Sequence, residues 1–285
     1  MHAVNYGFRL DDHLRLFILS YSKAAKKGSG GNMIGSAFRL LARQFGYVLW
    51  KRAYLRYGVD AFLDVERLSK TWNRPLDVVF DVGANAGQTA RAALAAFPGA
   101  HIFSFEPHPK VFAELKANIR DKRATLNDLA LGAEAGEVML YEYGDKGGGA
   151  SLRNSLVPNA RSAVQFGYTS KPISVRCTTL DQFCIDRGIA HIGLLKIDVE
   201  GFELSVLKGA LDMLRRGQIG FIYLEYNDLH PAPNASGGSL LELSDYLREF
   251  GYRFITNYTD FLSQGNSFFV VANALFAIPP SDATR

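Results

Sequence analysis

Residues 78–89 read Val78-Val79-Phe80-Asp81-Val82-Gly83-Ala84-Asn85-Ala86-Gly87-Gln88-Thr89. This pattern predicts an apolar strand, a glycine-containing turn and the start of a helix. Glycines in such a turn let the backbone approach a ligand closely, and a helix N-terminus favours anionic groups. A nicotinamide dinucleotide requires the spacing Gly-x-Gly-x-x-Gly, but Asn85 and Gln88 stand at its second and third glycine positions. Asp81 at the strand end suits a cationic or hydroxylic ligand better than a diphosphate, and a tight turn without a ligand is the alternative.

A carboxylate follows the second predicted strand. Glu106 ends the run Phe103-Ser104-Phe105 and lies 19 residues beyond Gly87. In doubly wound nucleotide-binding folds, a carboxylate at this place binds the hydroxyls of a ribose. We therefore predict that Glu106 is a ribose ligand. The alternative is an ordinary solvated surface acid.

From Pro75 onward, short apolar runs alternate with helical stretches, a pattern typical of βαβ units and a mostly parallel sheet. Strands are predicted at residues 77–81, 101–106, 125–128, 193–198, 219–225, 253–257 and 268–272. Helices are predicted at residues 87–97, 109–120, 180–187, 201–215 and 239–250. The segment 138–177 interrupts the alternation with two further strands, at 138–141 and 173–175, around a glycine-rich loop. The sequence therefore predicts an α/β domain over residues 76–285 with an insert at 138–177.

Residues 1–75 are predicted to form a basic helical extension. Apolar side chains recur at helical spacing in residues 10–21, 34–48 and 60–70. The extension holds 13 basic and 5 acidic side chains, whereas the rest of the chain holds 19 and 23. We interpret the excess charge as the solvated faces of helices docked on the body, with an anionic acceptor or a membrane surface as the alternative. These helices could also pair two subunits into a homodimer.

Composition narrows the class of protein. The 285-residue chain is 48% hydrophobic, which suffices for a buried core and excludes intrinsic disorder. No apolar run reaches the ~18 residues of a membrane-spanning helix, and no signal peptide is evident. Cys177 and Cys184 are too few for a disulfide framework and have no partners at zinc-finger spacing. We expect a reduced, cytoplasmic protein.

The fourth predicted strand, Leu194-Leu195-Lys196-Ile197-Asp198, carries charge into an apolar setting. Charges are rarely buried without a purpose, although Lys196 could simply neutralise a neighbouring carboxylate. Acidic and histidine side chains follow this strand and the next, so that Asp198, Glu200, Glu225 and His230 could converge on one rim. Such oxygen-rich groups suit Mg²⁺ or Mn²⁺. No local spacing requires a divalent metal, so we assign no metal ligands.

Three motifs follow one another along the chain: Asp81-Val-Gly-Ala-Asn-Ala-Gly-Gln, Ser104-Phe-Glu-Pro and Leu195-Lys-Ile-Asp-Val-Glu-Gly-Phe-Glu, the last followed by Val206-Leu-Lys-Gly-Ala. Together they resemble the FkbM-type family of S-adenosylmethionine-dependent methyltransferases. The resemblance covers residues 76–273, and its most diagnostic element is 196–201. Family members often have Gln where this chain has Glu200, which leaves the role of that position open.

The resemblance implies a class I methyltransferase fold: a Rossmann-like, seven-stranded, mostly parallel sheet with helices on both faces and an antiparallel last strand. It places the cofactor S-adenosyl-L-methionine at the C-terminal edge of the strands, where ligand crevices form in such folds. Glu106 would bind the ribose hydroxyls, and Asp198 would face the amino group or the reacting centre. The other cofactor residues implied are Asp81, Gly83, Asn85 and Gly87 around the methionine part, Asn127, Asp128 and Leu129 beside adenine, and Gln88 and Pro107.

The implied reaction is methyl transfer to a hydroxyl of a sugar or a polyketide-like natural product. An alcohol must lose its proton, and a carboxylate or His within ~3 Å can accept it. The catalytic candidates are Asp198, Glu200, Glu225 and His230. A small hydroxylated acceptor, the expected partner, would be seated by residues 147–158 and 231–234.

Two alternative functions stay open. One is an NAD(P)-dependent oxidoreductase on a similar sheet. The other is a non-catalytic module that binds nucleotides, or nucleic acid through the basic extension, although the chain has no recognition motif of a known nucleic-acid fold.

Overall fold

The computed structural model describes residues 55–144, 150–156, 169–226, 239–263 and 269–280. Residues 57–285 form one compact unit. The predicted helices at residues 10–21 and 34–48 lie outside the described residues. Within the described part of the chain, no helix has the length and apolar character needed to span a membrane.

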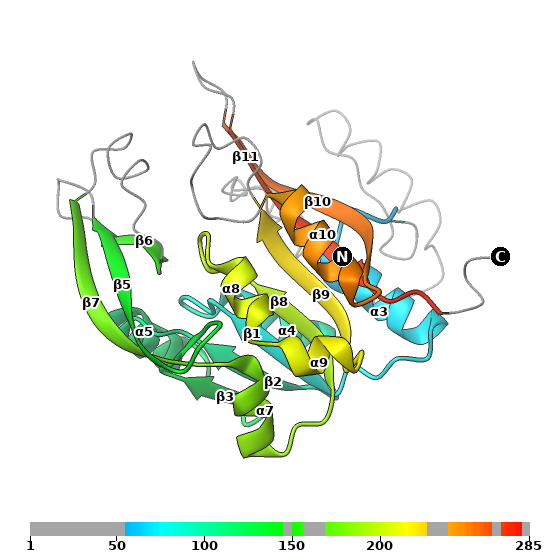
Figure 1. Ribbon diagram of the computed structural model, residues 1–285, viewed down its shortest axis with the longest axis horizontal. Coiled ribbons are helices and arrows are strands. Elements are labelled where there is room, and N and C mark those ends of the chain that lie inside the picture. Colours follow the sequence, from blue (N-terminus) through cyan, green and yellow to red (C-terminus); the bar gives the residue numbers. More distant parts are fainter. Residues whose placement is uncertain (1–54, 145–149, 157–168, 227–238, 264–268, 281–285) are drawn as a thin grey trace, which may run out of the picture. The chain divides into compact units, whose positions relative to one another are not determined.

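A seven-stranded sheet with the order β10-β11-β9-β8-β1-β2-β3 forms the centre of this unit (Figure 1). Its strands are β1 (Val78–Val82), β2 (His101–Phe105), β3 (Ala124–Asn127), β8 (Ile192–Ile197), β9 (Ile219–Tyr226), β10 (Arg253–Ser263) and β11 (Phe269–Ala277). Neighbouring strands from β9 to β3 are parallel, whereas β11 is antiparallel to both β9 and β10. The predicted class I fold, with its antiparallel last strand, is confirmed. The last two strands are longer than predicted.

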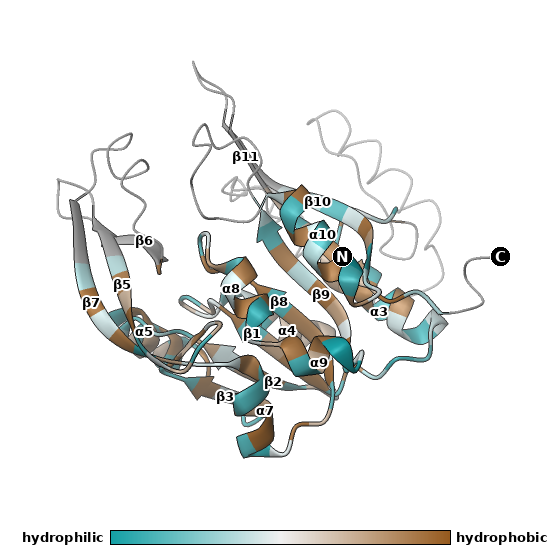
Figure 2. Cartoon of the chain, viewed as in Figure 1, coloured by the Kyte–Doolittle hydropathy of each residue, from teal (hydrophilic) through white to brown (hydrophobic). Residues whose placement is uncertain are grey.

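Helices cover both faces of the sheet, as the alternating side chains of the strands require. Phe80 and Leu195 are buried on one face, against α7 (Leu180–Arg187), α8 (Glu203–Lys208), α9 (Leu211–Arg215) and α10 (Leu240–Glu249). Val79 and Leu194, one residue earlier in each strand, are buried on the other face. That face is covered by α3 (Ala61–Thr71) and α4 (Gln88–Ala96), and α5 (Pro109–Asn118) packs against α4. Figure 2 shows the apolar residues gathered along the central strands and the helix sides that meet them.

The prediction of a single helix over residues 201–215 is wrong, because the chain forms two short helices there, α8 and α9. A Cβ at Gly209, between them, would lie 2.0 Å from the carbonyl oxygen of Gly132, so a side chain there would force the backbones apart. The second helix begins where the Asp181 carboxylate accepts hydrogen bonds from the N–H groups of Asp212 and Met213, at 2.7 and 3.0 Å. The close approach of Gly209 to Gly132 therefore ends α8, and the hydrogen bonds to Asp181 start α9.

The insert, together with the short strand β4 that precedes it, forms a second sheet of four strands with the order β4-β7-β5-β6. Its strands are β4 (Ala130–Leu131), β5 (Gly136–Gly144), β6 (Ala150–Ser155) and β7 (Thr169–Thr178). The two extra strands predicted here are confirmed as parts of β5 and β7, which form a long antiparallel ladder (Figure 1). Part of the predicted acceptor loop, residues 150–155, is the strand β6. Because β4 follows β3 after two residues, the insert begins beside the C-terminal edge of the main sheet.

The helix predicted over residues 60–70 is α3, and it belongs to the compact unit. The Asp60 side chain accepts a hydrogen bond from the Leu63 N–H at 2.9 Å and so caps the helix. The fully buried Asp64 carboxylate accepts hydrogen bonds from the Tyr258 hydroxyl at 2.9 Å and the Gly58 N–H at 2.8 Å. The bond from Tyr258 connects α3 to β10, and the bond from Gly58 connects α3 to the residues before it.

Candidate functional site

A pocket lies at the C-terminal edge of the main sheet. From β1 the chain builds the sheet outward through β2 and β3, and it later returns to the other side of β1 to form β8. Ligands of open α/β sheets bind at such a switch point. Predicted site residues that line the pocket are Gly83, Asn85, Glu106, Pro107, Leu129, Asp198 and Glu200. Leu140 and Leu156, from the insert, form part of the apolar wall together with Leu131. Leu156 lies within the predicted acceptor loop, residues 147–158, whereas the sequence did not assign Leu131 or Leu140 to the site.

The turn after β1 touches the turn after β8. The Asp198 N–H donates to the Val82 carbonyl oxygen at 3.0 Å. A Cβ at Gly83 would lie 1.8 Å from the Asp198 carbonyl oxygen, and Gly83 has a φ of +80°. Only glycine combines this left-handed conformation with so close an approach.

We expect Gly83→Ala to lower the free energy of unfolding by about 2 kcal/mol or more, because it adds both backbone strain and overlap with Asp198. Urea-induced unfolding measures this change. Gly99→Ala is the matched control, since a Cβ at Gly99 meets nothing within 4 Å. Equal stability of the two variants would contradict the close contact of the two turns.

Glu106 lines the pocket from the end of β2 and is 7% exposed. Its Oε2 accepts a hydrogen bond from the Asn85 N–H at 3.0 Å, and its Oε1 accepts one from the His108 N–H at 2.9 Å. Burial raises the pKa of Glu106, and these two N–H groups lower it by less. A carboxylate offers about four acceptor positions, so both oxygens can still accept from a ligand hydroxyl. Glu106 thus fixes the turn after β1 and keeps the capacity of a ribose ligand.

Five of the predicted cofactor residues are not among the pocket-lining residues: Asp81, Gly87, Gln88, Asn127 and Asp128. Asp81 is fully buried, Gly87 caps α4 and packs against α5, and Gln88 is exposed at the start of α4. The Asn127 amide donates to the backbone of β2 at 3.0 Å, and the exposed Asp128 pairs with a side chain of β7 at 2.8 Å. A direct contact of these five with a cofactor stays a prediction.

Lys196 is a buried cation beneath the pocket and is 4% exposed. Its Nζ lies 3.0 Å from Asp198 Oδ2 and 3.7 Å from Asp81 Oδ1. Burial alone would lower the pKa of Lys196, but the Asp198 and Asp81 carboxylates outweigh it and raise the pKa. Burial raises the pKa of Asp81, against the effect of Lys196. Lys196 does pair with neighbouring carboxylates, and one of them, Asp198, lines the pocket.

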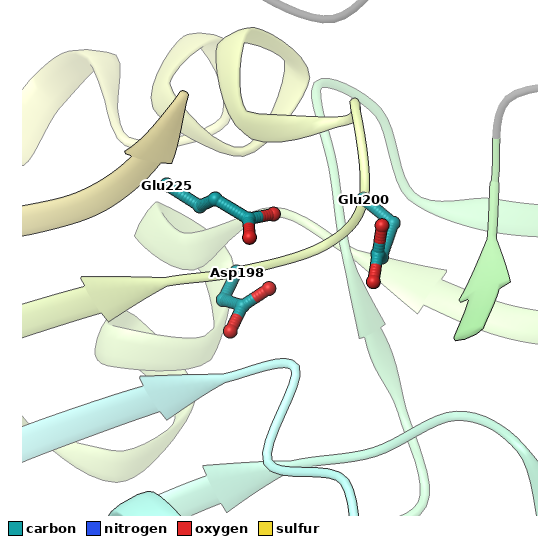
Figure 3. Close-up of side chains that lie close together, drawn as sticks. All are labelled: Asp198, Glu200 and Glu225. Carbon is teal, nitrogen blue, oxygen red and sulfur yellow. The ribbon is translucent and has the colours of Figure 1, made fainter. Parts of the chain in front are cut away.

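Three carboxylates converge beside the pocket (Figure 3). One oxygen from each of Asp198, Glu200 and Glu225 lies within 4.8 Å of the other two. The pairing of β8 with β9 sets Lys196 beside Tyr223, so Asp198 and Glu225, each two residues further, stand level at neighbouring strand ends. Burial raises the pKa of Glu225 well above its usual value, as do the neighbouring carboxylates, whereas Lys196 lowers it.

The structure thus brings together three of the four predicted catalytic candidates. His230, the fourth, lies outside the described residues, as do most residues of the predicted acceptor loops. Three carboxylates this close share the oxygen chemistry of divalent cation sites, the alternative that the sequence left open. They equally suit a proton that is shared or passed to one of them, because like charges at this distance oppose full ionisation.

Sequence reasoning did not assign Glu203 to the site. Glu203 is the first residue of α8 and is 3% exposed. Its Oε1 accepts hydrogen bonds from the N–H groups of Val199 and Gly201, at 3.1 and 3.2 Å. The available signal was its place at the end of the motif that starts at Leu195, five residues beyond Asp198.

Comparison with known proteins agrees with this geometry. Residues 81–254 match the family model described as the methyltransferase FkbM domain. The 31-O-demethyl-FK506 methyltransferase FkbM of Streptomyces tacrolimicus is 34% identical over 195 residues, which cover 59% of this chain and 69% of the relative. The 2-O-methyltransferase NoeI of Sinorhizobium fredii is 32% identical over 160 residues, covering 54% of this chain and 65% of the relative. The hexuronic acid methyltransferase AglP of Haloferax volcanii is 28% identical over 162 residues, covering 57% and 61%.

Among solved structures, the N-terminal domain of human METTL16 in complex with SAH aligns with a TM-score of 0.40 and 15% identity, over 86% of this chain and 81% of that one. This likeness is too slight to add to the sequence matches. The family model, in contrast, covers more than half of the chain and includes the pocket carboxylates Glu106, Asp198 and Glu200 as well as Glu225. The protein therefore belongs to the FkbM-type family of S-adenosylmethionine-dependent methyltransferases.

Proposed function

We propose that the protein is an S-adenosylmethionine-dependent O-methyltransferase that acts on a small hydroxylated molecule and uses Glu225 as its proton acceptor. One observation carries this proposal. Glu106 and the carboxylate cluster flank the turn after β1, so one pocket offers an acceptor for hydroxyl groups on one side and negative charge on the other.

The chemistry of the pocket fits the cofactor. Glu106 can accept from ribose hydroxyls, and the Leu side chains of the pocket wall suit the flat face of adenine. Asp198 and Glu200 provide negative charge for the ammonium and sulfonium groups. When bound, S-adenosylmethionine supplies a methyl group on a positively charged sulfur atom that a nucleophile can displace.

Glu225 is the best placed of the candidate bases. Asp198 is held by Lys196 at 3.0 Å, and Glu200 is exposed, whereas Glu225 is partly buried and stands beside both. With the cofactor bound, the Glu225 carboxylate would accept the hydroxyl proton of the acceptor while the acceptor oxygen displaces the sulfur atom, which would keep the electron pair of the broken bond. Because burial raises its pKa, Glu225 is a stronger base than an ordinary carboxylate, which suits proton transfer near neutral pH.

The acceptor that we propose is a neutral or cationic sugar or polyketide-like molecule. Two relatives carry names that refer to oxygen positions, 31-O and 2-O. The carboxylate cluster sets three carboxylates against one buried lysine, and this negative charge favours such an acceptor over an anionic one. A second copy of the chain, paired through residues 1–75, is a further proposed partner, and nucleic acid is not. The two buried free cysteines support a reducing, cytoplasmic location.

Calorimetry with S-adenosylhomocysteine, S-adenosylmethionine and NADH tests the proposed function. We expect the first two to bind and NADH not to bind. Binding of NADH alone would favour the oxidoreductase alternative, and salt-dependent binding of RNA or DNA without either sulfur compound would favour the nucleic-acid module. A screen of neutral sugars against the matching uronic acids then tests the acceptor class.

A further inference from the structure

The turn after β8 has an unusual backbone. Glu200 has a φ of +53° and Gly201 a φ of +103°, both in the left-handed region. That conformation is uncommon for a residue with a side chain and is strained unless the surroundings hold it. Turns of this kind can also aim successive N–H groups into one concavity, which attracts an anion.

Here the chain provides its own anion. A single oxygen, Glu203 Oε1, accepts from both the Val199 N–H and the Gly201 N–H, at 3.1 and 3.2 Å. The side chain is 3% exposed and begins α8, where a helix N-terminus favours a carboxylate. Burial raises the pKa of Glu203 to about 7, and the N–H groups lower it by less.

The turn after β8 positions two carboxylates of the pocket. Asp198 immediately precedes it and Glu200 lies within it, and both line the pocket, whereas Glu203 is not among the lining residues. Asp198 is anchored on one side by Lys196 and by its N–H bond to Val82. Glu200 has a left-handed backbone and lies between the two residues whose N–H groups donate to Glu203.

We propose that Glu203 is a positioning residue that fastens the Val199–Gly201 turn and so presents Glu200 and Asp198 to the pocket. The proposal rests on the proposed function, in that the pocket binds the cofactor. The essential feature is an acceptor oxygen at this distance from the backbone. Its negative charge is secondary, because a neutral carbonyl oxygen also accepts two hydrogen bonds.

Two variants of Glu203 separate the effect of side-chain length from the effect of negative charge. Glu203→Gln keeps an oxygen at the same distance and loses the charge, whereas Glu203→Asp keeps the charge and is one methylene shorter. Calorimetry should show that Glu203→Asp weakens binding of S-adenosylhomocysteine by about tenfold or more, and that Glu203→Gln stays within about threefold of the wild type. Wild-type affinity in Glu203→Asp, or a larger loss in Glu203→Gln than in Glu203→Asp, would overturn the proposal.

Amide hydrogen exchange tests the same turn without any ligand. The Val199 and Gly201 amides should be protected in the wild type and in Glu203→Gln and should exchange about tenfold faster or more in Glu203→Asp. Thermal unfolding of each variant confirms that the domain is folded. If the wild type fails to bind S-adenosylhomocysteine, the proposed function fails, but this exchange pattern still supports the fastening role. Equal exchange in all three proteins would refute it.

Discussion

Glu225→Gln is expected to lower kcat by about 10² to 10⁴, the usual contribution of a general base, while the affinity for S-adenosylhomocysteine changes little. The amide has nearly the shape of the carboxylate but cannot take a proton. Glu225 lies in the carboxylate cluster and is not among the residues that line the pocket, so cofactor contacts should survive. The measurement is the rate of S-adenosylhomocysteine formation with a hydroxylated acceptor found by screening, combined with calorimetry.

Glu249→Gln, at the exposed end of α10, is the matched control and should leave kcat unchanged. An unchanged kcat in Glu225→Gln would remove Glu225 from the mechanism. Loss of activity on removal of divalent cations with EDTA, restored by Mg²⁺, would instead assign the carboxylate cluster to a metal ion.

The pH dependence of kcat gives a separate test of Glu225. The base must be ionised to accept a proton, so kcat should rise with pH through the pKa of Glu225 and level off above it. Burial raises that pKa well above the ordinary value, and Glu203 is one of the neighbouring carboxylates that add to the effect. Glu203→Gln removes one negative charge and should therefore move the rise in kcat to lower pH. A rise that stays at the same pH would mean that Glu225 is not the titrating group.

Glu106→Ala is expected to weaken binding of S-adenosylhomocysteine by about 10² to 10⁴, since hydrogen bonds to a charged group contribute about 1.5–3 kcal/mol each and two ribose hydroxyls are involved. The same change also leaves the Asn85 and His108 N–H groups without their acceptor, which loosens the turn after β1. Calorimetry gives the affinity, and Glu134→Ala, at an exposed position between β4 and β5, is the control.

A ligand lacking one ribose hydroxyl separates the two roles of Glu106. The wild type should bind the 2′-deoxy analogue of S-adenosylhomocysteine more weakly than the parent compound. Glu106→Ala should discriminate less between the two ligands. Discrimination that is undiminished in the variant would mean that Glu106 supports the turn without contacting the ribose.

Local pattern predicted the strands and most helices because each is encoded within a few residues. The run 193–198 identified β8, and Glu106 at a strand tip identified one wall of the pocket, since parallel strands present their C-terminal ends to the same edge. The end of α8 could not be predicted in this way. It depends on the approach of Gly209 to Gly132, a contact between segments far apart in the chain.

The sequence alone therefore specified the fold class, the edge of the sheet that carries the pocket and several of the residues that line it. The arrangement of charged side chains around Lys196, in contrast, depends on tertiary packing. Side-chain alternation shows that Lys196 and Asp198 share a face, but it cannot show that β8 lies between β1 and β9 in the register that adds Asp81 and Glu225 to that face. The strand order also buries Asp81 beside Lys196, and its predicted contact with the cofactor stays a prediction. Strand pairing is made by backbone hydrogen bonds between distant segments. The raised pKa of Glu225 follows from its burial and from neighbouring carboxylates, which this pairing brings together.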